Sequence, residues 1–242
     1  MLVIGATSAI ARAVAEEFAS RGYNLYLAGR DLPELWRLAS DFEIRHGVSV
    51  QVGVVDAEDF AAHGEFVKHV IKRAGGLAGV VVALGYLGDQ SAVEKDPRDC
   101  VDVVTRNYSG GMSLLLHLAN HFEETRTGFV IGISSIAGDR GRVKNYVYGS
   151  AKAGMSAFLQ GLRARLHKVG VHVMTVKPGF VDTSMTYGMD GLMMLATPED
   201  VGKQIVRALE RRKDIAYVPG IWKWVMLAVR TIPERIFKKM KF

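Results

Sequence analysis

The chain carries a tyrosine and a lysine four residues apart, in the segment YGSAK from Tyr148 to Lys152. On a helix, this spacing puts the two side chains on one face. A free tyrosine has a pKa of about 10 and is a poor proton donor near neutrality. An ammonium about 4 Å away, at an effective dielectric constant of about 20, favours the phenolate by up to about 4 kcal/mol. We therefore expect Lys152 to lower the pKa of Tyr148 by about two or three units, which suits protonation of a carbonyl oxygen.

A serine precedes this pair by thirteen residues and could hold the same oxygen. Ser134 and Ser135 end an apolar run that reads as a strand. Ligands of parallel sheets bind beyond the carboxyl ends of the strands. A hydroxyl from Ser135 would there hydrogen-bond a carbonyl oxygen and fix it for hydride attack. The alternative is that Tyr148 and Lys152 merely share the surface of an ordinary helix.

The elements that must position these residues alternate along the chain. Short runs rich in valine and isoleucine fit the strands of a covered parallel sheet, and the stretches between them repeat apolar residues at helical spacing. The sequence predicts an α/β fold with a doubly wound parallel sheet of the Rossmann type. We expect a single domain over 1–218, followed by a short, basic, amphipathic tail over 219–242. The predicted strands are 2–5, 25–29, 50–55, 79–84, 128–134, 171–176 and 215–218.

The loop after the first strand, GATSAIA at 5–11, has the small residues of a phosphate-binding turn. Small residues let the chain turn sharply beside a pyrophosphate, and the helix that follows supplies N–H donors and the positive end of its dipole. Only one of the three usual glycines is present, so a plain strand-to-helix turn is the alternative. The cofactor contacts predicted here are Gly5, Thr7, Ser8, Ala9 and Ile10.

The end of the second predicted strand bears on the choice between NADH and NADPH. A site for NAD usually has an acidic side chain there, which binds the ribose hydroxyl. This chain has Gly29 at that position, followed by Arg30 and Asp31. A guanidinium pairs well with a 2′-phosphate. The sequence therefore predicts NADP(H) as cofactor, bound by Arg30, and a solvated Arg30–Asp31 pair is the alternative.

Taken in their order along the chain, the motifs resemble those of the short-chain dehydrogenase/reductase family over residues 2–218. YGSAK matches the family's Tyr-x-x-x-Lys motif, ISSIAG at 133–138 matches its serine strand, and RNYSGG at 106–111 matches its asparagine helix. The resemblance implies that Asn107 holds a water which relays protons from Lys152. The catalytic residues that it implies are Asn107, Ser135, Tyr148 and Lys152.

Further matches to the family concern the cofactor. VKPGFVDT at 176–183 matches the segment that contacts the nicotinamide, and Asp56 stands where the family contacts the adenine amino group. The chain departs from the family at VALG, 82–85, where Asn-Asn-Ala-Gly is usual, and in the alanines that replace two loop glycines. The cofactor contacts implied by the resemblance are Asp56, Ala83, Gly85, Tyr148, Lys152, Pro178, Gly179, Val181 and Thr183.

The predicted activity is NADPH-dependent reduction of a ketone to a secondary alcohol, with Tyr148 as general acid and base. A protein that binds NADP without catalysis is the alternative class. Family members that lose the reaction usually lose the tyrosine or the lysine, and both are present here.

Three segments bear on the substrate: 85–90 at the rim, 138–146 opposite it, and a methionine-rich lid near 183–197. A basic rim and an apolar lid suit a substrate with a phosphate and an apolar chain. A solvated loop and a lid packed on the body is the alternative. With the tail, these segments resemble a bacterial subgroup that includes the decaprenyl-phosphoryl keto-pentose reductases, which implies a lipid-linked or phosphorylated keto-sugar. The rival substrates are small soluble carbonyls, acyl ketones or steroids. The rim cations are Arg140, Arg142 and Lys144.

The charge of the chain is concentrated at one end. Six basic residues and one glutamate lie within 219–242 and account for +5 of the net charge of +6. A nucleic-acid partner is therefore not expected, since such proteins carry a basic face across the fold. Tryptophan and lysine interleaved with apolar residues are typical of an interfacial membrane anchor, and Pro233 should divide the tail into two short helices. An equal alternative is that the tail docks on a partner subunit.

One cysteine and no leader-like first segment predict a cytoplasmic protein, with peripheral contact to the inner face of the membrane if the tail is an anchor. His117 and His121 lie four residues apart, but no third ligand has useful spacing, so no metal site is predicted. In the resembled family the helix that carries these histidines and the one after it form a dimer seam, which implies a homodimer or homotetramer.

Overall fold

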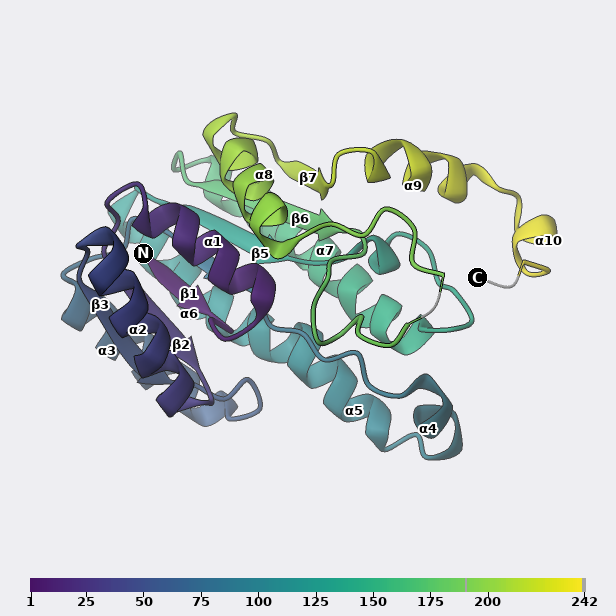
Figure 1. Ribbon diagram of the computed structural model, residues 1–242, viewed down its shortest axis with the longest axis horizontal. Helices are drawn as coiled ribbons and strands as arrows, with labels where there is room; N and C mark the ends of the chain where they lie inside the picture. The colour runs from purple at the N-terminus through teal and green to yellow at the C-terminus, as the bar shows by residue number, and fades with distance from the viewer. Residues whose placement is uncertain (190, 241–242) are drawn as a thin grey trace.

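Seven parallel strands form one sheet in the computed structural model, which describes residues 1–189 and 191–240 (Figure 1). The strand order is β3-β2-β1-β4-β5-β6-β7, so the chain starts in the middle and winds out in both directions. This confirms the predicted doubly wound sheet. The strands are β1 (Leu2–Ile4), β2 (Leu25–Gly29), β3 (Val50–Val54), β4 (Val80–Val82), β5 (Phe129–Ile133), β6 (His172–Pro178) and β7 (Ile215–Val218).

Two layers of helices cover the two faces of the sheet (Figure 1). One apolar core lies between the sheet and α1, α2 and α8, and a second lies between the sheet and α3, α6 and α7. The central strands β1, β2 and β4 are buried along their whole length, which explains their unbroken apolar runs. These helices are α1 (Ala9–Ala19), α2 (Leu32–His46), α3 (Phe60–Ala74), α6 (Gly110–Thr125), α7 (Tyr146–His167) and α8 (Pro198–Glu210).

Local capping chemistry sets the ends of several helices. The side chains of Ser8, Asp31 and Thr197 accept hydrogen bonds from backbone N–H groups in the first turns of α1, α2 and α8. Gly47 ends α2 in the left-handed conformation, with φ of 66°. These side chains and this glycine fix where the helices begin and end.

The remaining helices lie beyond the carboxyl ends of the strands, at the right of Figure 1. α4 (Gln90–Lys95) and α5 (Asp99–Val104) follow β4, and a π-helical turn, Thr105–Ser109, joins α5 to α6. The tail forms α9 (Trp222–Thr231) and α10 (Glu234–Phe237), divided at Pro233 as predicted. Within the described residues, no helix has the length and hydropathy needed to cross a bilayer.

Gly110 determines how closely α6 approaches the loop after β3. A Cβ at this position would lie 2.2 Å from the carbonyl oxygen of Ala57, which is backbone and cannot move aside. This approach brings the start of α6 against the loop that carries Asp56. The glycine is therefore needed to hold two loops of the predicted site together.

We expect Gly110→Ala to lower the free energy of unfolding by about 1–3 kcal/mol through overpacking. Gly161→Ala is the matched control, because Gly161 is also helical and a Cβ there would have nothing within 4 Å. That change should raise stability by about 0.5–1 kcal/mol through helix propensity. Urea denaturation measures both, and equal effects of the two changes would contradict the close approach.

Candidate active site

The predicted site residues lie on loops that leave one edge of the sheet. β1, β4, β5 and β6 are neighbours and parallel, so their carboxyl ends open side by side. The loops that follow them carry Gly5, Gly85, Ser135 and Gly179 respectively. The crossing α7 then brings Tyr148 and Lys152 to the same edge, where both are buried.

Lys152 is the most enclosed charge of this group, with 2% of its surface exposed. Its Nζ donates to the carbonyl oxygens of Leu84, at 2.9 Å, and Ile133, at 3.2 Å. The same Nζ lies 5.7 Å from the ring centre of Tyr148. Ser134 makes a further contact with α7, because its hydroxyl donates a hydrogen bond to the carbonyl oxygen of Lys152 at 2.9 Å. The lysine thus joins α7 to the ends of β4 and β5.

The predicted lowering of the Tyr148 pKa by Lys152 is wrong for this structure. Burial raises the pKa of Tyr148 to about 12, while the Ser135 hydroxyl and then the charge of Arg142 act in the lowering direction. Burial also lowers the pKa of Lys152 to about 8. The physical reason is desolvation, which disfavours both charged forms and which the sequence argument did not include. The side chain predicted as a remote rim cation, Arg142, is the cation that acts on the phenol.

Asn107 lies in the π-helical turn that joins α5 to α6, and it is 1% exposed. Its Nδ2 donates to the carbonyl oxygens of Tyr86 and Val103, and its Oδ1 accepts from the N–H of Tyr86 at 3.1 Å. A Cβ on Gly85 would lie 3.8 Å from this Oδ1 and 3.9 Å from the Nζ of Lys152. Asn107 and Lys152 therefore both lie beside one glycine. Turns of this type are common at functional sites.

The loop from β1 to α1 has the form of a cradle. Gly5 has φ of 78°, and a Cβ there would lie 2.7 Å from the carbonyl oxygen of Ala83. Only glycine meets both conditions. Thr7, Ala9 and Ile10 are half-buried, and Ser8, which caps α1, is exposed. The open start of α1, with its small residues, fits a pyrophosphate.

The loops after β2 and β3 carry the residues predicted to bind the adenosine end. Arg30 is exposed and follows Gly29 directly. Asp31 is used as the cap of α2, where its Oδ1 accepts from the N–H of Glu34 at 3.1 Å. Asp56 is half-buried and accepts from the N–H of Glu58 at 3.0 Å. Both residues are exposed, but the Asp31 carboxylate is engaged in capping, whereas Arg30 has no such role.

The segment after β6 contains the other predicted contacts. Pro178 and Val181 are buried, and Thr183 is half-buried. A Cβ on Gly179 would lie 1.9 Å from the Nε1 of Trp222, so the glycine makes room for a side chain of the tail. The tail tryptophan therefore packs against the segment that the sequence assigned to the nicotinamide.

A cavity of about 790 Å³ opens beside Ser135 and Tyr148. The predicted lid forms one wall with Met185, Met189 and Met193, and an isolated bridge between Val181 and Ala196 closes the base of the lid. Asp190 of the predicted lid lies outside the described residues. The opposite wall comes from the tail and was missed by the sequence analysis; it consists of Trp222, Val225, Met226 and Val229.

A family model described as short chain dehydrogenase matches residues 1–190. This chain belongs to the short-chain dehydrogenase family. An uncharacterized oxidoreductase of Mycobacterium tuberculosis is 35% identical over 240 residues, which cover 99% of this chain and 96% of the relative. An uncharacterized oxidoreductase of Streptomyces coelicolor is 36% identical over 241 residues, which cover 99% and 95%. The chain is thus an oxidoreductase of this family.

Solved structures share the fold of this short-chain dehydrogenase. One is a short-chain dehydrogenase from Sphingobium yanoikuyae in complex with NADPH, with a TM-score of 0.79, 24% identity and coverage of 95% of this chain and 93% of that one. Another is L-sorbose reductase from Gluconobacter frateurii complexed with NADPH and L-sorbose, with a TM-score of 0.79, 20% identity and coverage of 89% and 93%.

The tail of this short-chain dehydrogenase is held by Arg140, which corrects the prediction of a free rim cation. The Arg140 guanidinium donates to the carbonyl oxygens of Val229 and Ile232, both at 2.6 Å, at the end of α9. It also pairs with Glu234 at 3.0 Å and lies 3.8 Å above the ring centre of Phe237. The predicted rim position is right for Arg142 and Lys144, which line the cavity.

Asp139, the residue before Arg140, anchors the loop that carries these arginines. Its carboxylate pairs with the ammonium of Lys177 on β6 and accepts a hydrogen bond from the hydroxyl of Tyr217 on β7 at 2.7 Å. Burial, followed by this hydrogen bond, raises the pKa of Tyr217 to about 12. The loop is therefore fastened to the sheet at one residue and to the tail at the next.

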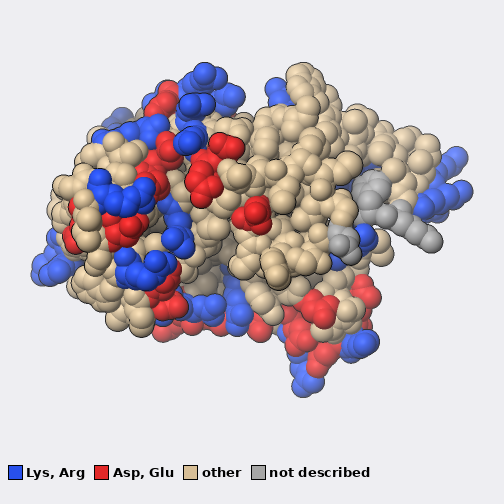
Figure 2. Space-filling model, in the orientation of Figure 1, with Lys and Arg blue, Asp and Glu red and all other residues tan. Residues whose placement is uncertain are grey.

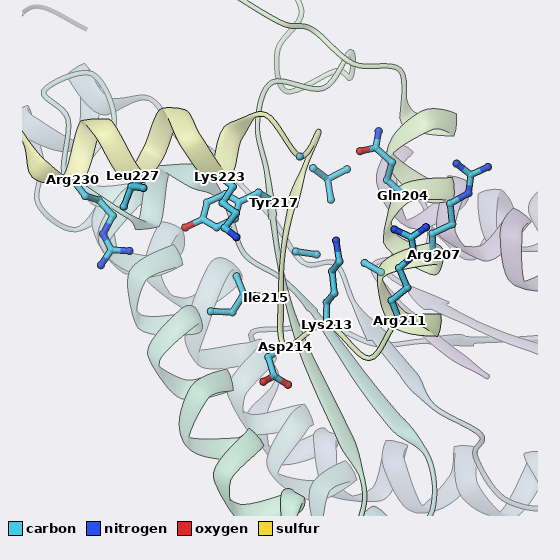
Figure 3. A pocket seen from close by; sticks show the side chains of 14 residues that line it. Gln204, Arg207, Arg211, Lys213, Asp214, Ile215, Tyr217, Lys223, Leu227 and Arg230 are labelled. Atoms are coloured by element: carbon cyan, nitrogen blue, oxygen red, sulfur yellow. The ribbon is translucent and has the colours of Figure 1, made fainter.

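A second cavity, of about 800 Å³, lies at the outer edge of β7, between α8 and α9 (Figure 3). Its side chains include Arg207, Arg211 and Lys213, and Asp214 is the one carboxylate among the described residues that line it. The described lining of this cavity includes none of the predicted catalytic or cofactor residues. We therefore assign the chemistry to the cavity beside Tyr148.

Burial of Lys152 predicts a characteristic pH dependence of stability. Folding lowers its pKa from 10.5 to about 8, so the unfolded chain binds more protons between these values and stability rises with pH there. Relative to Lys152→Met, the wild-type free energy of unfolding should increase by about 1.4 kcal/mol for each pH unit between about 8 and 10. Urea titrations across this range measure the difference, and parallel pH profiles of the two proteins would disprove it.

Loss of the Arg140 contacts should release the tail. We expect Arg140→Met to speed chymotryptic cleavage within α9 about tenfold, which corresponds to about 1.4 kcal/mol of local stability. Arg235→Met is the matched control, because Arg235 is an exposed arginine of the same tail. Limited proteolysis followed by mass spectrometry identifies the cleaved bonds, and equal cleavage rates of both variants would show that Arg140 does not hold the tail.

Proposed function

We propose that this protein reduces a ketone to a secondary alcohol with NADPH, using Tyr148 as the general acid. The observation that carries the proposal is the mostly apolar cavity whose lining includes Ser135 and Tyr148. A ketone bound there meets a hydroxyl and a phenol, and an apolar wall excludes competing water.

The cofactor proposal rests on the loops at the carboxyl edge of the sheet. The cradle at Gly5 and the start of α1 fit a pyrophosphate, and exposed Arg30 suits a 2′-phosphate. Two structures of the same fold, from Sphingobium yanoikuyae and Gluconobacter frateurii, are complexes with NADPH. NADPH supplies the hydride when it is bound.

Side chains of the protein would donate the proton and replace it. Ser135 donates a hydrogen bond to the carbonyl oxygen and orients it, and Tyr148 delivers its phenolic proton to that oxygen. The neutral phenol is the form required of a proton donor, and a pKa of about 12 keeps it protonated before the reaction. Lys152, whose pKa is about 8, can give up a proton near neutrality and so resupply Tyr148. Asn107, which also lies beside Gly85, would hold a water for that relay.

The substrate class we favour is a lipid-linked or phosphorylated keto-sugar. The lid and the tail expose apolar side chains beside the cavity, among them Tyr187 at 89%, Met193 at 66% and Trp224 at 63%. Figure 2 shows few charges over this part of the molecule, with basic side chains at its far end. Such a surface suits contact with a membrane that holds the substrate. Docking of the same surface on a partner subunit would instead favour a small soluble carbonyl.

The experiment follows NADPH consumption with bacterial membrane lipid extract and, separately, with a panel of soluble ketones. Tyr148→Phe should lower kcat about a hundredfold to ten-thousandfold, because it removes the proton donor. Tyr146→Phe, on an exposed tyrosine of the same helix, should leave kcat unchanged.

The results with the lipid extract and with the soluble ketones distinguish the two proposed substrate classes. Turnover with the lipid fraction alone supports the lipid-linked substrate. Turnover with soluble ketones alone removes that substrate and favours a tail that serves a partner subunit. Full activity of Tyr148→Phe with either substrate would overturn the proposed role of the phenol.

A further inference from the structure

Three buried polar atoms without hydrogen-bond partners belong to residues of the same cavity. Among the described residues, four buried side-chain polar atoms lack a partner, and three of them are Nε of Arg142, Oδ1 of Asn145 and Nε1 of Trp222. All three residues line the cavity beside Tyr148. An unsatisfied buried polar atom is costly, so a group of them in one cavity calls for a ligand that satisfies them.

The surroundings of Arg142 differ sharply from those of Arg140, two residues earlier. The Arg140 guanidinium is satisfied by carbonyl oxygens and by Glu234. For Arg142 the part of the chain that the structure describes provides neither an ion pair nor a side-chain hydrogen bond. No carboxylate of the described residues lines the cavity, and Lys144 adds a second cation. The cavity therefore holds positive charge that its own walls do not neutralise.

Asn145 supports the same conclusion from its place in the fold. It precedes α7 at the N-cap position, where an asparagine normally accepts a backbone hydrogen bond, yet its side chain makes no such bond. Its Oδ1 is buried without a partner instead. A side chain that lines a cavity and makes no capping bond can form a hydrogen bond with a ligand instead.

We infer that Arg142, with Asn145 and Trp222, forms a subsite for an anionic oxygen group, a phosphate or a carboxylate, on the substrate. This inference rests on the proposed function in one respect, namely that the substrate occupies this cavity. Guanidinium and indole N–H groups are donors that match the oxygens of an anion, and the amide oxygen accepts from a hydroxyl beside it. Because the same cavity reaches Tyr148, the anion lies on the same molecule as the ketone and close to it.

Apolar residues make up the rest of the lining, and they specify the other end of the ligand. The lid contributes Met185, Met189 and Met193, whose flexible side chains adapt to irregular apolar shapes. The matching ligand has an anionic head near its ketone and an apolar remainder. A neutral ketone of the same shape would leave the Arg142 charge buried and unpaired, and so would bind more weakly.

Calorimetry on the full chain tests the subsite without using turnover. The probes are octyl phosphate, octanoate and octanol, with saturating NADP⁺ present so that the phosphate-binding loops of the cofactor site do not contribute. We expect at least one anion to bind about tenfold or more tightly than octanol, as a charge-assisted hydrogen bond would produce. The stronger of the two anions tells phosphate from carboxylate.

Variants then assign the preference to Arg142. Arg142→Gln should bring the affinity for the anion down to that for octanol, and leave octanol binding unchanged. Lys95→Gln, a change of an exposed cation outside the lining of this cavity, should keep the preference. Trp222→Phe keeps the ring and removes the N–H, so it should weaken anion binding about twofold to tenfold. This third variant is informative even if Arg142→Gln folds poorly.

Equal affinity of the wild-type protein for octanol and both anions would overturn the subsite, and so would a preference that survives Arg142→Gln. The outcome is independent of the proposed reaction. Tyr148→Phe should keep the preference while it loses reduction, so a failed ketone assay with intact anion binding would reject the reaction and retain the subsite.

Discussion

A buried ammonium organises the site. The Nζ of Lys152 binds carbonyl oxygens at the ends of β4 and β5, and the Lys152 carbonyl accepts from Ser134. These bonds fix the position and rotation of α7 across the edge of the sheet. Tyr148, one turn earlier on α7, meets Ser135 only because that rotation is fixed. The charge is solvated by carbonyl dipoles rather than by a carboxylate, so it stays available for proton exchange at a cost in folding free energy.

Desolvation acts on both members of the pair and moves both toward neutrality. It raises the pKa of Tyr148 to about 12 and lowers that of Lys152 to about 8. A buried site of this kind needs other cations to stabilise a phenolate when one forms, and Arg142 is the side chain whose charge acts on Tyr148 here. Residues that recognise an anionic substrate can thereby also influence the proton donor. Occupation of the Arg142 subsite by an anion would reduce that influence and keep the phenol protonated.

Local patterns were sufficient to predict the sheet and the edge of it at which Ser135, Tyr148 and Lys152 lie. The apolar runs, the cradle at Gly5 and the Tyr148–Lys152 spacing each depend on residues close together in the sequence. The division of the tail at Pro233 followed from the same kind of argument. What the sequence could not supply was the position of the tail. Its apolar residues recur at helical spacing, but that periodicity does not say which surface they cover.

The contact that fixes the position of the tail joins residues far apart in the chain. Arg140 reaches Val229, 89 residues later, and the sequence alone gives no reason to pair them. The prediction for the pKa of Tyr148 was wrong for a related reason, because burial depends on every residue packed around the phenol. Periodicity and spacing report on neighbours along the chain, whereas desolvation and long-range packing depend on the complete fold.

The origin of the cavity walls has a consequence for how such enzymes diverge. The matched family region covers residues 1–190, whereas Trp222, Met226 and Val229 of the cavity come from α9, which lies beyond that region. The gene thus encodes the proposed catalytic residues and Arg142 in one stretch, and the tail wall of the cavity in a later one. Changes near its 3′ end can reshape the pocket without touching the sheet or the tetrad. Exchange of tails between relatives would for this reason replace one wall of the pocket and leave the sheet unchanged.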